Sequence, residues 1–312
     1  MMDGPKIGMH QWMRPEPLES TLRRLQRYGY DCIELMGGPD LFCPKRTLPL
    51  LNKYDIECTG AVAIMTTGLD LTQPDREGRQ ATVEYLVQML KMIKRLGGRA
   101  LSVFPAEVGR TVAHQNCSPE DCWSWCVEGL KRVTETADSL NLKIGIEPIC
   151  RWETNFFNRH DPALELAQEV GPSVGVVLDT YHMALEEDNS VQAIQAVGNK
   201  LLGFHIADSN RRPPGEGQID WKNIFLALRK IDYQGVILAE FAMPLDRTPT
   251  ARPPTVWRTA IPDVPGTDPA LLKFIVDHGS GVSSEEDYDI AVSQTMDFLK
   301  GYLSVPDCSE TS

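Results

Sequence analysis

The sequence predicts an α/β fold, a (β/α)8 TIM barrel with a long insertion after the eighth strand. Eight short apolar segments alternate with longer segments that have the apolar periodicity of helices. Buried parallel strands read as continuous apolar runs, and helical connections between them favour right-handed crossovers. We therefore expect residues 1–312 to form a single barrel domain. An open, doubly wound sheet is the alternative, but His10-Gln11-Trp12 stands after the first strand in place of a Gly-x-Gly-x-x-Gly turn.

The eight expected strands are bounded by helix signals. They are residues 7–12, 32–37, 57–64, 100–105, 144–148, 176–182, 201–209 and 235–241. The clearest helical patterns are residues 17–30, 81–98, 119–141 and 220–235. Ser118 and Asp220 are typical of helix starts, and Gly97 and Gly235 are typical of helix ends.

The segment after the eighth strand breaks the alternation. Residues 241–284 are rich in proline, and a helical pattern resumes at residue 285. A loop this long inside a compact domain is usually functional or mobile. After the eighth strand it would emerge at the mouth of the barrel, where it would cover the site or meet another subunit; the alternative is a disordered surface insertion. We expect the tail, residues 304–312, to be frayed.

The charge of the chain limits its partners. With 43 Asp and Glu against 31 Lys and Arg, the formal net charge is -12, which disfavours nucleic acid and anionic membranes as partners. The first residues lack the apolar core of a signal peptide, and no later apolar run reaches the roughly 20 residues that span a bilayer. We expect a cytoplasmic protein.

Four of the later strands end on a side chain that can bind a metal ion: Glu147, Asp179, His205 and Glu240. A buried carboxylate without a partner is costly, and the carboxyl ends of barrel strands all face one mouth. Four such endings in succession therefore indicate one divalent metal ion where the strands converge. Three carboxylates and one imidazole suit Mn²⁺, Co²⁺ or Mg²⁺ better than a structural zinc site of thiolates.

The segments that carry these side chains resemble the motifs of a known enzyme family. They are residues 147–153 (EPICRWE), 178–182 (LDTYH), 205–211 (HIADSNR) and 238–240 (LAE). They are similar to the xylose-isomerase-like TIM-barrel sugar isomerase and epimerase superfamily, and they look most like its D-tagatose/D-psicose 3-epimerase type. The chain differs at Cys150-Arg151-Trp152, where that family often has Asn-Arg-Tyr.

The resemblance implies a set of roles for the site residues. It implies a ketose held on one divalent ion, Mn²⁺ or Co²⁺, by the four strand-end residues, with Glu147 and Glu240 doubling as acid and base. It also implies that Glu153, His182 and Arg211 bind the substrate. From the residues alone, His182 could instead support the metal ligands, and Arg211 could be a solvated loop arginine.

The chemistry can also be built from the residues. A proton on the carbon next to a sugar carbonyl is too weakly acidic for a carboxylate to remove unless a cation stabilises the developing enediolate. Epimerisation takes a proton from one face and returns it to the other, which requires two carboxyl groups, here Glu147 and Glu240. We expect His10 to line the pocket. The leading prediction is a divalent-metal-dependent isomerase or epimerase of a keto sugar.

Two other functions remain open. The sequence also resembles the catalytic subunit of bacterial C-glycoside deglycosidases, lyases that would cleave a 3-keto-glycoside by the same proton abstraction followed by elimination; the long insertion after Glu240 favours this reading. Such a lyase would pair with a small β subunit, whereas an epimerase is expected to be a homo-oligomer. The third reading is a barrel that binds a sugar without catalysis. An apurinic endonuclease is disfavoured, because its zinc cluster needs more histidines than these strand ends supply.

Overall fold

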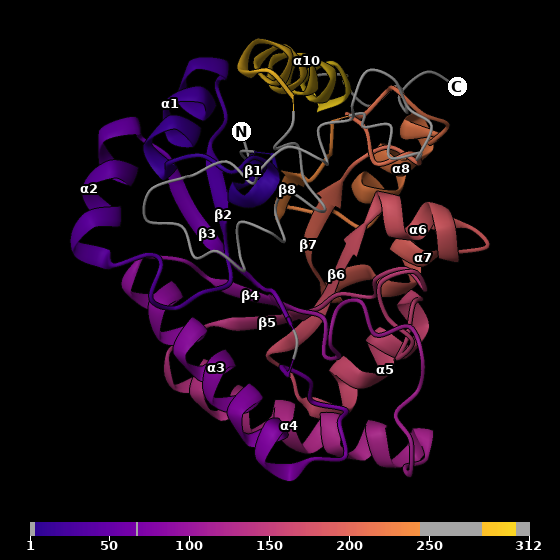
Figure 1. Cartoon of the computed structure of the whole chain (residues 1–312). Coiled ribbons are helices and arrows are strands. Elements are labelled where there is room, and N and C mark those ends of the chain that lie inside the picture. Colours follow the sequence, from indigo (N-terminus) through magenta and orange to yellow (C-terminus); the bar gives the residue numbers. More distant parts are fainter. Residues whose placement is uncertain (1–3, 67, 244–282, 304–312) are drawn as a thin grey trace, which may run out of the picture.

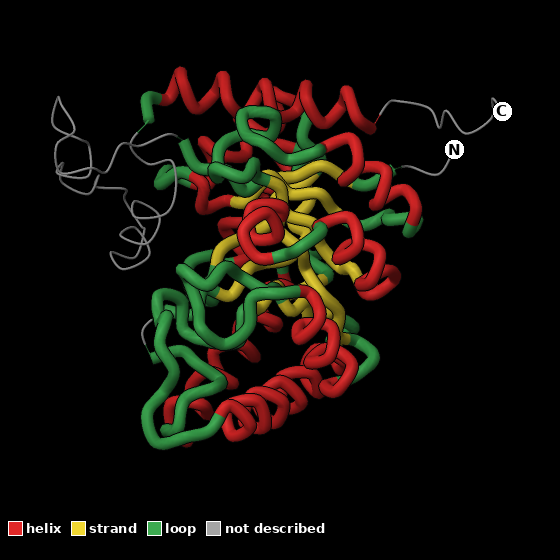
Figure 2. Tube along the Cα trace, turned by 90° about the vertical axis from the view of Figure 1, so that its right-hand side faces the viewer, coloured by secondary structure: helices red, strands yellow, loops and turns green. Residues whose placement is uncertain are grey.

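The computed structural model describes residues 4–66, 68–243 and 283–303. Eight parallel strands form a closed barrel in which each strand pairs with its neighbour in the chain and β8 pairs with β1. Helices surround the strands on the outside (Figures 1 and 2), so the predicted (β/α)8 barrel is confirmed. The strands are β1 Lys6–His10, β2 Cys32–Met36, β3 Glu57–Ala63, β4 Ala100–Val103, β5 Lys143–Ile146, β6 Val174–Asp179, β7 Leu201–Ile206 and β8 Val236–Ala239.

The helices lie between the strands in chain order. They are α1 Leu18–Tyr28, α2 Pro44–Tyr54, α3 Arg76–Arg95, α4 Pro119–Ser139, α5 His160–Val170, α6 Thr180–Glu186, α7 Ser190–Val197, α8 Trp221–Lys230 and α10 Glu285–Leu303, with short 3-10 turns at Gln11–Met13 and Gly198–Lys200. No helix in the described ranges is both long and apolar enough to cross a bilayer. The cytoplasmic location stays a prediction.

Most of the expected helix boundaries are confirmed. Ser118 caps α4 in a capping box, and the Asp220 side chain accepts a backbone hydrogen bond at the start of α8. Gly97 follows α3 with a φ of 82°, the left-handed conformation that glycine favours. Gly235 was expected to end a helix, but α8 ends at Lys230 and Gly235 directly precedes β8. A turn separates α8 from β8, and glycine is as suitable at the end of such a turn as directly after a helix, so the residue type alone did not show which position it occupies.

Close strand contacts hold the barrel together. At Gly60 a Cβ atom would lie 2.0 Å from the carbonyl oxygen of Ala100 on the neighbouring strand β4. The lack of a side chain at Gly60 therefore lets β3 and β4 approach each other. The side chains that face the barrel interior and those that face the helices are both buried, which explains why most strands read as unbroken apolar runs.

Helix α10 completes the ring by packing against α1 and α8 (Figure 1). The Tyr30 hydroxyl donates to the carbonyl oxygen of Val292 at 2.9 Å, and Arg24 on α1 pairs with Asp289 on α10. The expected insertion at residues 241–284 lies mostly outside the described residues, which omit 244–282, and the expected frayed tail at 304–312 lies outside them entirely. Both expectations stay predictions, as does the single-domain boundary.

Candidate active site

The four strand-end residues converge at the carboxyl end of the barrel. Glu147 directly follows β5, Asp179 ends β6, His205 lies near the end of β7, and Glu240 directly follows β8. All four side chains are buried. Nδ1 of His205 lies 2.9 Å from Oε1 of Glu147 and 3.1 Å from Oε2 of Glu240. Residues 58 positions apart in the chain thus meet in one site because parallel strands end at the same mouth.

Asp179 lies on the other side of Glu147, beside His182. Ligand atoms of Glu147, Asp179 and His182 all lie within 4.8 Å of one another, as do those of Glu147, His205 and Glu240. Oδ1 of Asp179 accepts from the Tyr181 amide at 2.8 Å, whereas the buried Oδ2 has no hydrogen-bond partner among the described residues. A buried carboxylate oxygen without a partner is rare and costly, and it fits a position where a cation binds.

His10 and Glu34 form a second layer behind His205. Oε2 of Glu34 lies 3.3 Å from Nδ1 of His10 and 3.4 Å from Nε2 of His205, while Oε1 accepts from the Ser102 hydroxyl at 2.9 Å. Nε2 of His10 lies 3.3 Å from Oε2 of Glu240. The prediction placed His10 in the pocket lining; the structure places it between two buried carboxylates, one of them Glu240.

Glu34 is a site residue that the sequence reasoning missed. It lies within β2, is only 4% exposed, and is the charged residue in the run Cys-Ile-Glu-Leu-Met. The signal was the one that revealed the four strand ends, a carboxylate in an apolar run, but here the charge lies inside the run instead of at its end.

Arg211 links two carboxylates across the mouth. Nη1 lies 2.7 Å from Oε1 of Glu153 and Nη2 lies 3.3 Å from Oε1 of Glu240. The guanidinium also stacks over the Tyr181 ring at 4.8 Å from its centroid. Arg211 has a φ of 60°, uncommon for a non-glycine residue, and its carbonyl oxygen accepts from the Ala242 amide at 2.7 Å. Arg211 is thus an ordered part of the site and not a solvated loop arginine.

His182 is fixed by a backbone contact. Its Nδ1 lies 3.1 Å from the amide nitrogen of Cys150 and accepts that hydrogen bond. The proton of the neutral ring is therefore on Nε2, which lies 3.8 Å from Oδ2 of Asp179. A histidine held in this tautomer presents a donor toward the centre of the site.

The site carries more buried negative charge than its cations balance. Burial raises the pKa of Asp179 to about 6 and also raises the pKa of Glu147. Burial alone would raise the pKa of Glu240, but His10, His205 and Arg211 together lower it. Burial alone would lower the pKa of His205, but the surrounding carboxylates raise it well above the usual value. A divalent cation would balance this excess, and the oxygen-rich donor set suits a hard ion.

Comparisons with known proteins point to one family. The family model described as a xylose isomerase-like TIM barrel matches residues 22–261. A ketose 3-epimerase of Arthrobacter globiformis is 33% identical over 261 residues, 81% of this chain and 89% of that protein. A probable ketose 3-epimerase of Synechocystis sp. is 28% identical over 284 residues, 88% of this chain and 98% of that protein. The crystal structure of a D-allulose 3-epimerase from Methylomonas sp. in complex with D-allulose is 24% identical with a TM-score of 0.79, over 96% of this chain and 97% of that one. The resemblance expected from the strand-end motifs is confirmed, and the chain belongs to the xylose isomerase-like TIM barrel family.

Proposed function

We propose that the chain is a divalent-metal-dependent epimerase that acts on the carbon next to the carbonyl of an unphosphorylated keto sugar. Its family and the ketose 3-epimerases among its relatives make it a sugar isomerase or epimerase. One observation carries the proposal further: Glu147 and Glu240 come from different strands and approach the same ring nitrogen of His205, at 2.9 and 3.1 Å. Proton transfer between opposite faces of a sugar carbon requires two carboxyl groups, and we propose that this pair supplies them.

We assign the metal to Glu147, Asp179, His205 and Glu240, with Mn²⁺ as the first candidate and Co²⁺ or Mg²⁺ as alternatives. Two features support this assignment: Oδ2 of Asp179 accepts no hydrogen bond from the described residues, and buried carboxylates are in excess. When bound, the ion would stabilise the negative charge that develops on the sugar oxygens. This is the help that a carboxylate base needs to remove such a weakly acidic proton.

Glu147 and Glu240 are the proposed acid and base. Burial raises the pKa of Glu147, whereas the neighbouring cationic groups hold the pKa of Glu240 below its usual value despite its burial. In this proposal one of the two carboxylates removes the proton and the other returns one to the opposite face of the carbon, and the roles exchange in the reverse reaction.

Arg211, Glu153 and His182 are the proposed substrate-binding residues. Arg211 holds Glu240 and Glu153 in place, and its remaining N–H groups suit sugar hydroxyls. The Nε2 proton of His182 suits an oxygen near the reacting carbon. His10 contacts Glu240 at 3.3 Å, so we propose that it positions this carboxylate in addition to closing the bottom of the pocket.

The charge of the site favours an unphosphorylated sugar. Arg211 already has two carboxylate partners, so it has little capacity to neutralise a phosphate group. The three carboxylates of Glu147, Asp179 and Glu240 carry more negative charge than one divalent cation balances, so a phosphate dianion brought among them would be repelled. A neutral ketose avoids this cost.

The lyase reading stays a second candidate because of one side chain. Trp152 lies in the loop between β5 and α5, next to Glu153, and is 71% exposed. An exposed indole beside the mouth offers a flat apolar surface for the aglycone of a 3-keto-glycoside. The other feature that favoured this reading, the segment after Glu240, lies mostly outside the described residues.

One assay separates the three readings. The purified chain is incubated in D₂O with Mn²⁺ and either D-fructose, D-psicose or a 3-keto-glycoside, and the products are analysed by NMR. The epimerase predicts interconversion of the ketoses with solvent deuterium at the inverted carbon. Release of aglycone from the 3-keto-glycoside alone would favour the lyase, and binding of sugar without deuterium incorporation would favour a non-catalytic barrel.

Substitution of the two glutamates tests the assigned chemistry. Glu147→Gln and Glu240→Gln should each lower kcat by about 10²- to 10⁴-fold, the usual contribution of a positioned acid or base. Circular dichroism should show an intact fold, and Glu57→Gln, an exposed carboxylate on β3, is the matched control. Near-normal turnover in both site variants would show that the acid and base lie elsewhere.

A further inference from the structure

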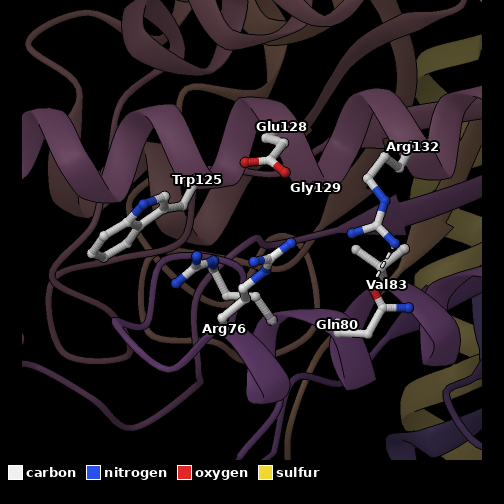
Figure 3. Close-up of a pocket in the computed structure, with 8 residues that line it drawn as sticks. Arg76, Gln80, Val83, Trp125, Glu128, Gly129 and Arg132 are labelled. Atoms are coloured by element: carbon white, nitrogen blue, oxygen red, sulfur yellow. Dashed lines mark hydrogen bonds between the residues drawn. The ribbon is translucent and has the colours of Figure 1, made fainter.

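A cavity of about 570 Å³ is lined by residues of α3 and α4. Figure 1 shows these two helices on the outside of the barrel, and Figure 3 shows the lining side chains. This volume is within the usual range of small-molecule sites. The cavity is lined by Arg76, Arg79, Gln80, Val83, Trp125, Glu128, Gly129 and Arg132. The two helices pack side by side, and each supplies arginine, so the lining residues come together only in the folded chain.

The cavity is positively charged in an acidic protein. Three of its lining residues are arginines and one is a glutamate, Glu128, whereas the whole chain has a formal net charge of -12. Within the described part of the chain, none of the three guanidinium groups lies within 4 Å of a carboxylate oxygen. Guanidinium groups that outnumber the neighbouring carboxylates attract an anion.

Arg79 is held in place before any ligand arrives. Its Nη1 donates to the carbonyl oxygens of Gln73 and Pro74 at 2.7 and 2.9 Å. Its guanidinium stacks on the ring of Trp125, 4.4 Å from the centroid. These contacts fix one edge of the guanidinium on the backbone and leave further N–H groups for a ligand. A cation ordered in this way loses less conformational entropy on binding than a mobile surface arginine.

A side-chain contact also connects the two helices at the opposite wall of the cavity. Arg132 donates to the side-chain oxygen of Gln80, which connects α4 to α3 (Figure 3). Val83 and Gly129 are buried beneath them. A Cβ atom at Gly129 would lie 2.9 Å from a methyl group of Leu71, so α4 packs closely on the loop before α3 at this point. Figure 3 shows Arg76 and Arg132 on different sides of the opening, with Trp125 at one end.

We propose that this cavity binds a small phosphorylated metabolite, with Arg76, Arg79 and Arg132 contacting its phosphate oxygens. Guanidinium groups match phosphate in geometry and can donate two parallel hydrogen bonds. The ligand would act outside the barrel, because the acid-rich strand ends disfavour phosphate. This inference does not depend on the reaction proposed for the barrel.

Calorimetric titration tests the proposal with two probes. Inorganic pyrophosphate reports the phosphate contacts alone, and ADP adds a base that could contact Trp125. We expect the wild-type protein to bind pyrophosphate with a Kd below about 1 mM at low salt. Arg76→Gln and Arg132→Gln should each weaken binding by about tenfold or more, since each removes a charge-assisted hydrogen bond. Tighter binding of ADP than of pyrophosphate, lost in Trp125→Leu, would identify a nucleotide as the ligand; equal binding would identify the phosphate group alone.

The control is Arg46→Gln, which removes an exposed arginine on α2 and changes the net charge by the same amount. Its Kd should stay at the wild-type value. The proposal is overturned if the wild-type protein binds neither probe up to about 10 mM, or if Arg46→Gln weakens binding as much as Arg132→Gln. It is also overturned if sedimentation shows that Arg132→Gln dissociates an oligomer, because the cavity would then receive a second copy of the chain.

Discussion

Glu34→Gln tests whether the carboxylate that the sequence did not reveal orients His205, which we propose as a metal ligand. Nδ1 of His205 faces Glu147 and Glu240, and Nε2 faces Oε2 of Glu34 at 3.4 Å. With Nδ1 as the ligand atom, Nε2 would carry the proton beside Oε2 of Glu34, with which it makes no hydrogen bond among the described residues. Glutamine keeps the size of the side chain but removes its charge.

The expected effect follows from this single lost charge. Carboxylates that accept the second N–H of a metal-bound histidine typically contribute 10- to 100-fold to metal affinity. We therefore expect the Kd for Mn²⁺ to rise by about 10- to 100-fold in Glu34→Gln, which corresponds to about 1.4–2.8 kcal/mol. Calorimetric titration of the metal-depleted protein measures this Kd directly and does not depend on turnover.

Two controls separate orientation from general damage. Ser102→Ala removes the neutral hydrogen bond to the other oxygen of Glu34, 2.9 Å long, and should raise the Kd by no more than about fivefold. Glu57→Gln removes an exposed carboxylate on the adjacent strand and should leave the Kd unchanged. An unchanged Kd in Glu34→Gln, or an equal loss in Glu57→Gln, would refute the orienting role.

Two further predictions concern stability. Gly60→Ala should destabilise the fold by about 3 kcal/mol or more, because the new methyl group meets the Ala100 carbonyl oxygen at 2.0 Å. Gly301→Ala in α10 should not destabilise it, because among the described residues a Cβ there meets nothing within 4 Å beyond its own helix. Denaturant titration of both variants checks the pair. Asp208→Asn should cost about 3 kcal/mol, because the amide would face two of the donors that the buried carboxylate now satisfies, such as Trp221 Nε1. Burial alone would raise the pKa of Asp208, but the hydrogen-bond donors lower it below its usual value. The stability that the Asp208 carboxylate contributes is therefore present above the unfolded-state pKa and is lost as the pH falls through the folded-state pKa. The prediction is contradicted if, on acidification, the wild-type protein loses stability no faster than Asp208→Asn.

The strand-end residues could be predicted because barrel topology converts sequence order into spatial order. Once alternating strands and helices are recognised, any charged residue at the carboxyl end of a strand must face the same mouth. That rule identified four residues from the sequence alone, without any interatomic distance: Glu147, Asp179, His205 and Glu240. It did not find Glu34, since β2 continues to Met36 and the apolar run does not end at the charge. In a strand buried on both faces, hydrophobic alternation does not tell which side chains point inward.

Loop contacts could not be predicted in the same way. Arg211 meets Glu153 and Glu240, which are 58 and 29 positions away in the chain, through loops whose paths depend on individual backbone angles. The φ of 60° at Arg211 is one such angle, and no pattern in the sequence predicts it. The cavity between α3 and α4 could not be predicted for a related reason. In the sequence, Arg76 and Arg132 have the pattern of ordinary surface residues, and only the packing of the two helices brings them together.

The two sites differ in the sign of the charge that their side chains bring together. The barrel mouth gathers carboxylates around one arginine that is already paired, which favours a cation and a neutral sugar. The outer cavity gathers three arginines around one carboxylate, which favours an anion. The electrostatic interaction of a phosphate group is therefore unfavourable at the barrel mouth and favourable in the outer cavity. A phosphorylated sugar is therefore expected to bind this protein without being turned over, and raising the ketose concentration should not displace it.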